Sequence, residues 1–146
     1  MNAKPGTYGL VLRADKRAVV QVGRWGAIDM RPGYYIYIGS AFGPGGLLAR
    51  VSRHCREVKP KHWHIDYLRE MATLESVWYS HRQTRLEHRW AKALAKWSNT
   101  DSVYGFGCSD CRCDSHLFYC DKRPTLAGFA DTVGCSVKSW FCDEAG

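Results

Sequence analysis

The residues best suited to chemistry lie in one stretch, residues 33–56, which reads GYYIYIGSAFGPGGLLARVSRHCR. Arg50 and His54 are four positions apart, so a helix would place them on one side of its surface, with Arg53 beside them. A guanidinium offers a planar fork to a phosphate and keeps its charge, and an imidazole can relay a proton. These residue types suit chemistry on a phosphate group.

A second group of candidate residues could hold a zinc ion. Cys108, Cys111, Cys113 and His116 together offer three sulfurs and an imidazole, a donor set that suits tetrahedral zinc. The C-x-C spacing is tight, and in a strand His116 would point away from the face shared by Cys111 and Cys113. Buried reduced cysteine is therefore the preferred alternative. Asp110 and His116 could instead line a catalytic cleft.

A third set follows in KPKHWHIDYL, where His62 and His64 are two apart and Asp66 comes two further on. Two imidazoles and a carboxylate make a plausible three-ligand set. The preferred interpretation is structural. In it the intervening apolar residues pack, and the polar residues face solvent or bind backbone phosphates.

Hydrophobic periodicity predicts one α+β domain that carries these residues. The alternation in YYIYIG places Tyr35, Tyr37 and Gly39 on one face of a strand and the residues between them on the other. The glycines and proline that follow allow a tight turn into a helix. The predicted strands are 7–12, 17–22, 34–39, 73–80 and 116–120, and the predicted helices are 46–56, 65–71, 84–97 and a short one within 124–134.

The helix predicted over residues 84–97 has an apolar stripe that includes Trp90 and Leu94. Thr84 followed by Glu87 fits a capping box, which would give Glu87 a purely structural role. Glu87 also lies at the edge of the stripe, where a carboxylate could face a cleft. Both interpretations remain open at this point.

The charge is uneven along the chain. Of 146 residues, 21 are Lys or Arg and 14 are Asp or Glu, for a net charge of +7. The balance is +4 over residues 1–49, +6 over 50–100 and −3 over 101–146. A basic body attracts phosphates and releases their counterions, so nucleic acid is a predicted partner. The cations expected to contact it are Arg53, Arg56, Lys59 and Lys61.

The remaining composition restricts the class of protein. The apolar runs are too short to span a membrane, and MNAKPG lacks the apolar core of a signal peptide, so a cytoplasmic location is expected. The seven cysteines form an odd set. We therefore expect reduced thiols rather than a disulfide framework.

Several motifs in one register resemble the GIY-YIG nuclease superfamily. They are GTY at 6–8, YIG at 37–39, the glycine turn and R-x-x-R-H. GSAFGPGGLLARVSRH, HWHIDYL and GCSDCRCDSHLFY are most similar to its small, stand-alone Uri-type branch, whose members also occur fused to DNA-repair glycosylases. The resemblance covers about residues 6–120 and leaves 121–146 as a C-terminal extension. Thr7 replaces the usual apolar residue, GPGG lengthens one gap, and the Asn that many relatives carry has no counterpart.

The resemblance implies a single domain with a small, mostly antiparallel sheet flanked by helices. It also implies a magnesium- or manganese-dependent endonuclease that hydrolyses phosphodiester bonds in DNA. The catalytic residues it implies are Tyr8, Tyr37, Arg50, His54 and Glu87. Mg²⁺ keeps several waters and prefers carboxylate, so Glu87 alone would suffice as its anchor.

The resemblance also assigns roles to the other four residues. Arg50 would hold the scissile phosphate. Tyr8 would be the general base if metal and arginine lower its pKa, with Tyr37 in support. His54 would relay a proton or position the phosphate.

Other functions are compatible with the same residues. Tyrosines in strands usually pack, and arginines on helices are usually solvated. The main alternative is a nucleic-acid-binding module of this fold that does not cut, stiffened by zinc at Cys108, Cys111, Cys113 and His116. A protein-interaction domain has little positive support. Single or double strands, DNA or RNA, a repair-protein partner and the oligomeric state all stay open.

Overall fold

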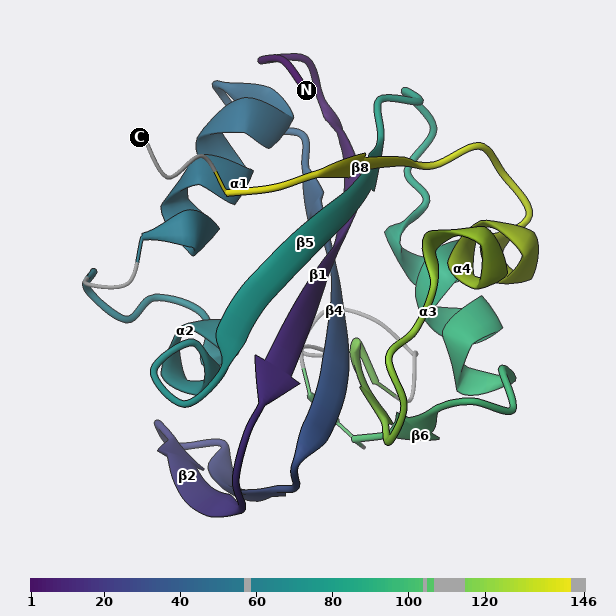
Figure 1. The fold of residues 1–146 in the computed structure, drawn as a ribbon. Helices are drawn as coiled ribbons and strands as arrows, with labels where there is room; N and C mark the ends of the chain where they lie inside the picture. Colours follow the sequence, from purple (N-terminus) through teal and green to yellow (C-terminus); the bar gives the residue numbers. More distant parts are fainter. Residues whose placement is uncertain (57–58, 104, 107–114, 143–146) are drawn as a thin grey trace.

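The computed structural model describes residues 1–56, 59–103, 105–106 and 115–142 (Figure 1). Its main sheet has the order β6-β7-β4-β1-β5-β8, and β2 and β3 form a second, two-stranded sheet. Every strand pair in the described part is antiparallel. The elements are β1 (Gly6–Ala14), β2 (Ala18–Val22), β3 (Gly26–Met30), β4 (Gly33–Ala41), α1 (Gly46–Cys55), α2 (His64–Leu68), β5 (Thr73–Ser80), α3 (Glu87–Ala95), β6 (Asp101–Ser102), β7 (Leu117–Cys120), α4 (Leu126–Val133) and β8 (Lys138–Trp140). The predicted single α+β domain is confirmed.

Helices cover both faces of the main sheet. In Figure 1, α1 and α2 lie on one side of β1, β4 and β5, and α3 and α4 lie on the other. The alternation predicted for β4 is confirmed, because Tyr35 and Tyr37 pack with the core that contains Leu47 of α1, whereas Ile36 and Ile38 pack with the core of α3 and α4. No helix of the described residues is long and apolar enough to cross a membrane.

Three short strands, β3, β6 and β8, were not predicted. Gly26–Met30 was assigned to no helix or strand, but it forms β3 and pairs with β2, with Ile28 and Met30 buried. Its two buried apolar residues are too few to give a clear period-two signal. β8 is three residues long and exists because it pairs with the edge of β5.

The glycine turn before α1 is required by backbone geometry. Gly45 and Gly46 have φ values of 82° and 57°, in the left-handed region that favours glycine. A Cβ at Gly46 would also collide with the backbone oxygens of Ala3 and Lys4. This close approach lets the Lys4 carbonyl accept a hydrogen bond of 3.0 Å from the backbone N–H of Leu47. The N-terminal segment thereby satisfies a donor in the first turn of α1.

The start of α3 differs from the prediction. The helix begins at Glu87, its N-cap is Leu86, and no side chain caps it, so the Thr84–Glu87 capping box was wrong. The hydroxyl of Thr7 in β1 instead accepts a hydrogen bond of 3.4 Å from the backbone N–H of Leu86. Thr7, the departure from the apolar residue expected there, thus connects β1 to the start of α3, and the Glu87 side chain is left for other contacts.

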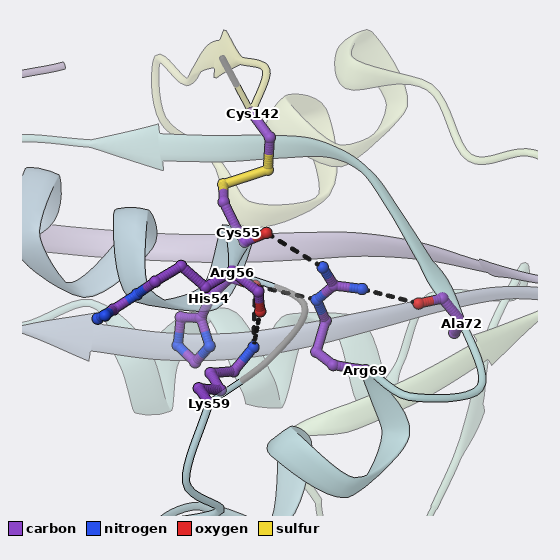
Figure 2. The surroundings of a disulfide bond; sticks show 7 residues. All are labelled: His54, Cys55, Arg56, Lys59, Arg69, Ala72 and Cys142. Carbon is purple, nitrogen blue, oxygen red and sulfur yellow. Dashed lines mark hydrogen bonds between the residues drawn. A yellow bond between two sulfur atoms is a disulfide. The ribbon is translucent and has the colours of Figure 1, made fainter. Parts of the chain in front are cut away.

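The prediction of wholly reduced cysteines was wrong for two residues. Cys55, at the end of α1, forms a disulfide with Cys142, with their Cα atoms 5.7 Å apart (Figure 2). The two are 87 positions apart and meet only because β8 returns along β5, which spacing alone does not reveal. Cys120 and Cys135 are free. The proposed zinc ligands Cys108, Cys111 and Cys113, and also Asp110, lie outside the described residues.

The C-terminal end of α1 is held by a buried guanidinium. Arg69 donates from Nε to the carbonyl of His54 at 2.9 Å, and also to the carbonyls of Cys55 and Ala72 (Figure 2). Lys59 adds a bond to the carbonyl of His54 at 3.4 Å. The last carbonyls of a helix lack intrahelical donors, so cations here stabilise its end. This arrangement fixes the backbone that carries the His54 side chain.

Candidate active site

Tyr8 and Tyr37 project from neighbouring strands on the α1 side of the sheet. Tyr8 of β1 pairs with Gly39 of β4, and Tyr37 is two residues before Gly39, so the two phenols are diagonal neighbours on one face. A Cβ on Gly39 would lie 2.5 Å from the hydroxyl oxygen of Tyr8. The glycine of the YIG segment therefore makes room for the ring of Tyr8, which is almost fully buried.

His54 on α1 lies against Tyr8. The phenol Oη and His54 Nε2 are 2.9 Å apart, and both side chains are buried. Burial lowers the pKa of His54 to about 3, so its ring is neutral at neutral pH. A neutral Nε2 with a lone pair accepts the hydrogen bond that the Tyr8 hydroxyl donates. His54 Nδ1 has no hydrogen-bond partner among the described residues.

Burial dominates the pKa of Tyr8. Burial raises it well above its usual value of 10, and the nearby Arg50 guanidinium only partly opposes that effect. Burial likewise raises the pKa of Tyr37, to which the neighbouring Tyr8 and Glu87 add. Both phenols are therefore protonated at neutral pH. Any base function of Tyr8 has to use its hydrogen bond to His54 rather than a standing phenolate.

Arg50 and Glu87 meet at Ser40, near the end of β4. Arg50 Nη1 donates to the backbone oxygen of Ser40 at 2.9 Å, and the side chain of the same Ser40 lowers the pKa of the nearby Glu87 carboxyl group. Arg50 also borders a hollow of about 170 Å³ that is lined by Gly43 and Pro44 of the glycine turn. The guanidinium and the carboxylate act electrostatically on both Tyr8 and Tyr37. All five residues predicted to be catalytic thus converge on one site.

Glu87 is anionic in this site. Burial by itself would raise its pKa, but hydrogen bonds from His116 and Ser40 and the nearby ring of His88 outweigh burial and lower it. The closest contact joins Glu87 Oε2 and His116 Nδ1 at 2.8 Å. The same Nδ1 is 3.3 Å from the carbonyl oxygen of Ile38. Two acceptors at one nitrogen indicate that Nδ1 carries the ring proton.

The indole of Trp63 lies against both Arg50 and Arg53. The guanidinium carbons of Arg50 and Arg53 lie 4.5 Å and 4.4 Å from the centre of the indole, within range of cation–π attraction. Arg53 also donates two hydrogen bonds of 3.0 Å to the buried Asp66 carboxylate. Asp66 in turn accepts from the backbone N–H of Trp63 at 2.9 Å. This packing holds the Arg50 side chain in its orientation.

The four cations predicted to contact nucleic acid have different surroundings. Arg53 is held by Asp66, and Lys59 donates to the carbonyls of His54 and Arg56 at the end of α1. Lys61 forms an exposed ion pair of 2.5 Å with Glu70, and Arg56 is exposed. Their contact with nucleic acid stays a prediction.

Comparison with known protein families gives one result. The family model described as Domain of unknown function DUF123 matches residues 7–137. The chain belongs to this family. The match extends from β1 through α4 and includes all five converging residues, so the site lies within the region that defines the DUF123 family. Searches of curated proteins and of solved structures gave no match.

The donor set of this DUF123 chain fits a divalent cation at Glu87. Glu87, His88 and His116 each offer a possible ligand atom, and these atoms lie within 4.8 Å of one another. Within the part of the chain that the structure describes, no other group of three such side chains is this close. The alternative set of His62, His64 and Asp66 is not assembled, because Asp66 is bound to Arg53 and to backbone N–H groups.

Sequence reasoning missed part of the surroundings of Glu87. His116 was considered as a zinc ligand or as lining a cleft with Asp110, but it pairs with Glu87. His88 and Ser40 were not considered. His88 directly follows the proposed metal anchor and Ser40 directly follows YIG, and these adjacencies were the available signals. The role of Trp63 depends on the contact between α1 and the start of α2, which has no sequence signature.

The free energy of unfolding is expected to fall as the pH drops below 6.5. The folded-state pKa of His54 is about 3, below its unfolded value of 6.5, so this contribution is complete above pH 6.5 and is lost as the pH falls toward 3. By pH 4 the loss is on the order of 3 kcal/mol. Among the nearby charged groups, Asp66 raises the pKa of His54, whereas Lys59, Arg50 and Arg53 lower it.

Urea unfolding at pH 7, 5.5 and 4 tests this expectation. His54→Gln should show a shallower fall in stability than the wild-type protein, because glutamine does not titrate. His62→Gln, which changes an exposed histidine, should follow the wild-type curve. Parallel curves for wild type and His54→Gln would contradict the assignment.

Proposed function

We propose that this protein is a divalent-metal-dependent endonuclease of the GIY-YIG type that hydrolyses phosphodiester bonds in DNA. One observation carries the proposal. Arg50 and Glu87, distant in sequence, meet at Ser40 beside the hydrogen-bonded pair of Tyr8 and His54. A cation for phosphate, a carboxylate for metal and a pair that can move a proton are the groups that phosphodiester hydrolysis needs.

Arg50 is proposed to bind the scissile phosphate. Its contact with Ser40 and its stacking on Trp63 leave the planar group pre-oriented beside the open hollow formed by the glycine turn. A fixed guanidinium can make two parallel hydrogen bonds to phosphate oxygens and stabilise the charge that grows on them.

Tyr8 and His54 are proposed to move the proton of the attacking water. Because the Tyr8 hydroxyl donates to Nε2, its oxygen can accept a hydrogen bond from water. The water proton then passes to Oη while the phenol proton passes to Nε2, so no free phenolate has to form. The new O–P bond forms as the bond to the leaving oxygen breaks, and the leaving oxygen takes up a proton from solvent water. Asp66 and the phosphate charge favour the imidazolium formed at His54.

A divalent cation is proposed to bind at the anionic Glu87. When bound, it supplies positive charge to the phosphate and lowers the pKa of a water molecule. Tyr37, next to Tyr8 and within electrostatic reach of Glu87, supports the same surface by orienting water.

The test is cleavage of supercoiled plasmid and of a single-stranded oligonucleotide with Mg²⁺ or Mn²⁺. Arg50→Ala is expected to lower the cleavage rate by about 100- to 1,000-fold, the range for losing one donor to a developing charge. Arg50→Lys should restore only part of the lost cleavage rate, because an ammonium cannot form the planar fork.

Arg24→Ala is the matched control, because Arg24 is an exposed arginine in the turn between β2 and β3 and its removal changes the net charge equally. It should cleave at the wild-type rate. Binding of DNA without metal-dependent cleavage would refute the enzyme and favour the non-catalytic nucleic-acid-binding module. Equal rates for Arg50→Ala and Arg24→Ala would refute the assigned site.

A further inference from the structure

Two imidazoles lie beside the carboxylate proposed as metal anchor. Glu87 and His88 are consecutive in the first turn of α3, and His116 directly precedes β7. Consecutive helical residues point about 100° apart, so Glu87 and His88 do not face each other. A third side chain is needed to complete a cluster with them. His116 supplies that group, because its Nδ1 is 2.8 Å from Glu87 Oε2 and its ring centre is 5.7 Å from that of His88.

We propose that Glu87, His88 and His116 form a three-ligand centre for a divalent first-row transition ion, which binds in preference to Mg²⁺. One possible ligand atom from each residue lies within 4.8 Å of the other two, a separation that small side-chain movements can close around one ion. The role of this centre in cleavage rests on the proposed nuclease function. Its ability to bind metal does not.

The preference follows from the donor atoms. Mg²⁺ demands oxygen ligands and holds its waters, so a site with two imidazoles suits it poorly. Imidazole together with carboxylate suits Mn²⁺, Fe²⁺, Co²⁺ and Zn²⁺. An ion here would replace the proton that now lies between Glu87 and His116, because metals bind deprotonated nitrogen. Glu87 provides one negative charge, and His88 is exposed.

A purely structural pairing of Glu87 with His116 makes a different prediction. The contact between them would then only fasten the start of α3 to the segment before β7, and His88 would be a surface residue with no effect on metal binding. His88 therefore discriminates between the two interpretations. Since it is exposed, replacing it should leave the fold intact, unlike replacing the buried His116.

The experiment measures Mn²⁺ binding to the metal-free full chain, with thiols reduced, by equilibrium dialysis and by loss of the free Mn²⁺ signal in electron paramagnetic resonance. Mn²⁺ is the probe because cysteine thiols of the chain would compete for softer ions such as Zn²⁺. We expect one Mn²⁺ per chain. His88→Ala should weaken its binding by at least about tenfold, the lower bound for disturbing even an outer partner of a metal ligand.

His62→Ala is the matched control, because it removes another exposed histidine outside the cluster. It should bind Mn²⁺ as the wild type does, and an equal concentration of Mg²⁺ should displace little of the ion. Wild-type affinity in His88→Ala, equal competition by Mg²⁺, or no Mn²⁺ binding at all would each overturn the proposal.

The proposed function and the proposed centre can fail separately. Mn²⁺ binding that depends on His88, without any DNA cleavage, would keep the centre and refute the nuclease. Cleavage that depends on Glu87 but is unchanged in His88→Ala and equally supported by Mg²⁺ would keep the nuclease and refute the centre.

Discussion

Tyr8→Phe is expected to reduce the rate of DNA cleavage by about 100- to 10,000-fold, the usual contribution of a positioned acid–base group. The substitution removes the oxygen that would accept the proton of water and the proton that now lies on the path to His54 Nε2. DNA affinity should change little, because Arg50 and the basic surface remain. Single-turnover cleavage and fluorescence anisotropy separate the two quantities.

Tyr35→Phe provides the control for the loss of a strand phenol. Tyr35 lies on the same face of β4 as Tyr37, but its hydroxyl accepts a hydrogen bond from the backbone N–H of Arg31, outside the site. The cleavage rate of Tyr35→Phe should match that of the wild type. The rate of Tyr37→Phe should lie between those of Tyr8→Phe and Tyr35→Phe. The double variant Tyr8→Phe/His54→Gln should be no slower than Tyr8→Phe, because the pair acts as a unit. Wild-type cleavage by Tyr8→Phe would exclude the proposed proton path.

Asp66→Ala is expected to lower the free energy of unfolding by about 3–5 kcal/mol, the cost of removing one partner from a buried ion pair. The Asp66 side chain is fully buried, whereas that of Arg53 is 18% exposed, so water relieves part of the charge left behind. The carboxylate also accepts from the backbone N–H groups of His62 and Trp63. Urea denaturation monitored by tryptophan fluorescence measures the loss.

Glu70→Ala is the matched control for a carboxylate in an ion pair. Glu70 and Lys61 pair at the surface, with side chains 51% and 38% exposed, so the cost should be below about 1 kcal/mol. Asp66→Ala should also slow cleavage, because Arg53 and Trp63, which lies against Arg50, would lose the hydrogen bonds that hold them. Equal stability of the Asp66 and Glu70 variants would show that the buried pair does not anchor this part of the fold.

Local pattern was sufficient for much of the fold. The period of two in residues 34–39 assigned Tyr35 and Tyr37 to one face, and the helical spacing around Trp90 and Leu94 located the buried side of α3. Both signals are local, because side-chain direction follows directly from strand or helix geometry. The glycine turn was likewise visible, since Gly45 and Gly46 adopt positive φ that few other residues tolerate.

Only the tertiary structure decided which of these residues meet. The sequence left Glu87 open as a capping residue or as a carboxylate facing a cleft. In the structure Thr7, in another strand, satisfies the start of α3, and Glu87 contacts His116. The disulfide depends on a three-residue edge strand that carries Cys142 to the end of α1.

The pKa values also could not be predicted from the sequence, because the burial of a group depends on everything packed around it. The base role implied for Tyr8 required metal and Arg50 to lower its pKa, and the structure shows that burial raises this pKa while Arg50 only partly opposes the effect. The sequence by itself determined which types of side chain lie on each face of the strands and helices. The long-range packing decided their distances and their protonation, because contacts between distant segments exist only when the whole sheet has assembled.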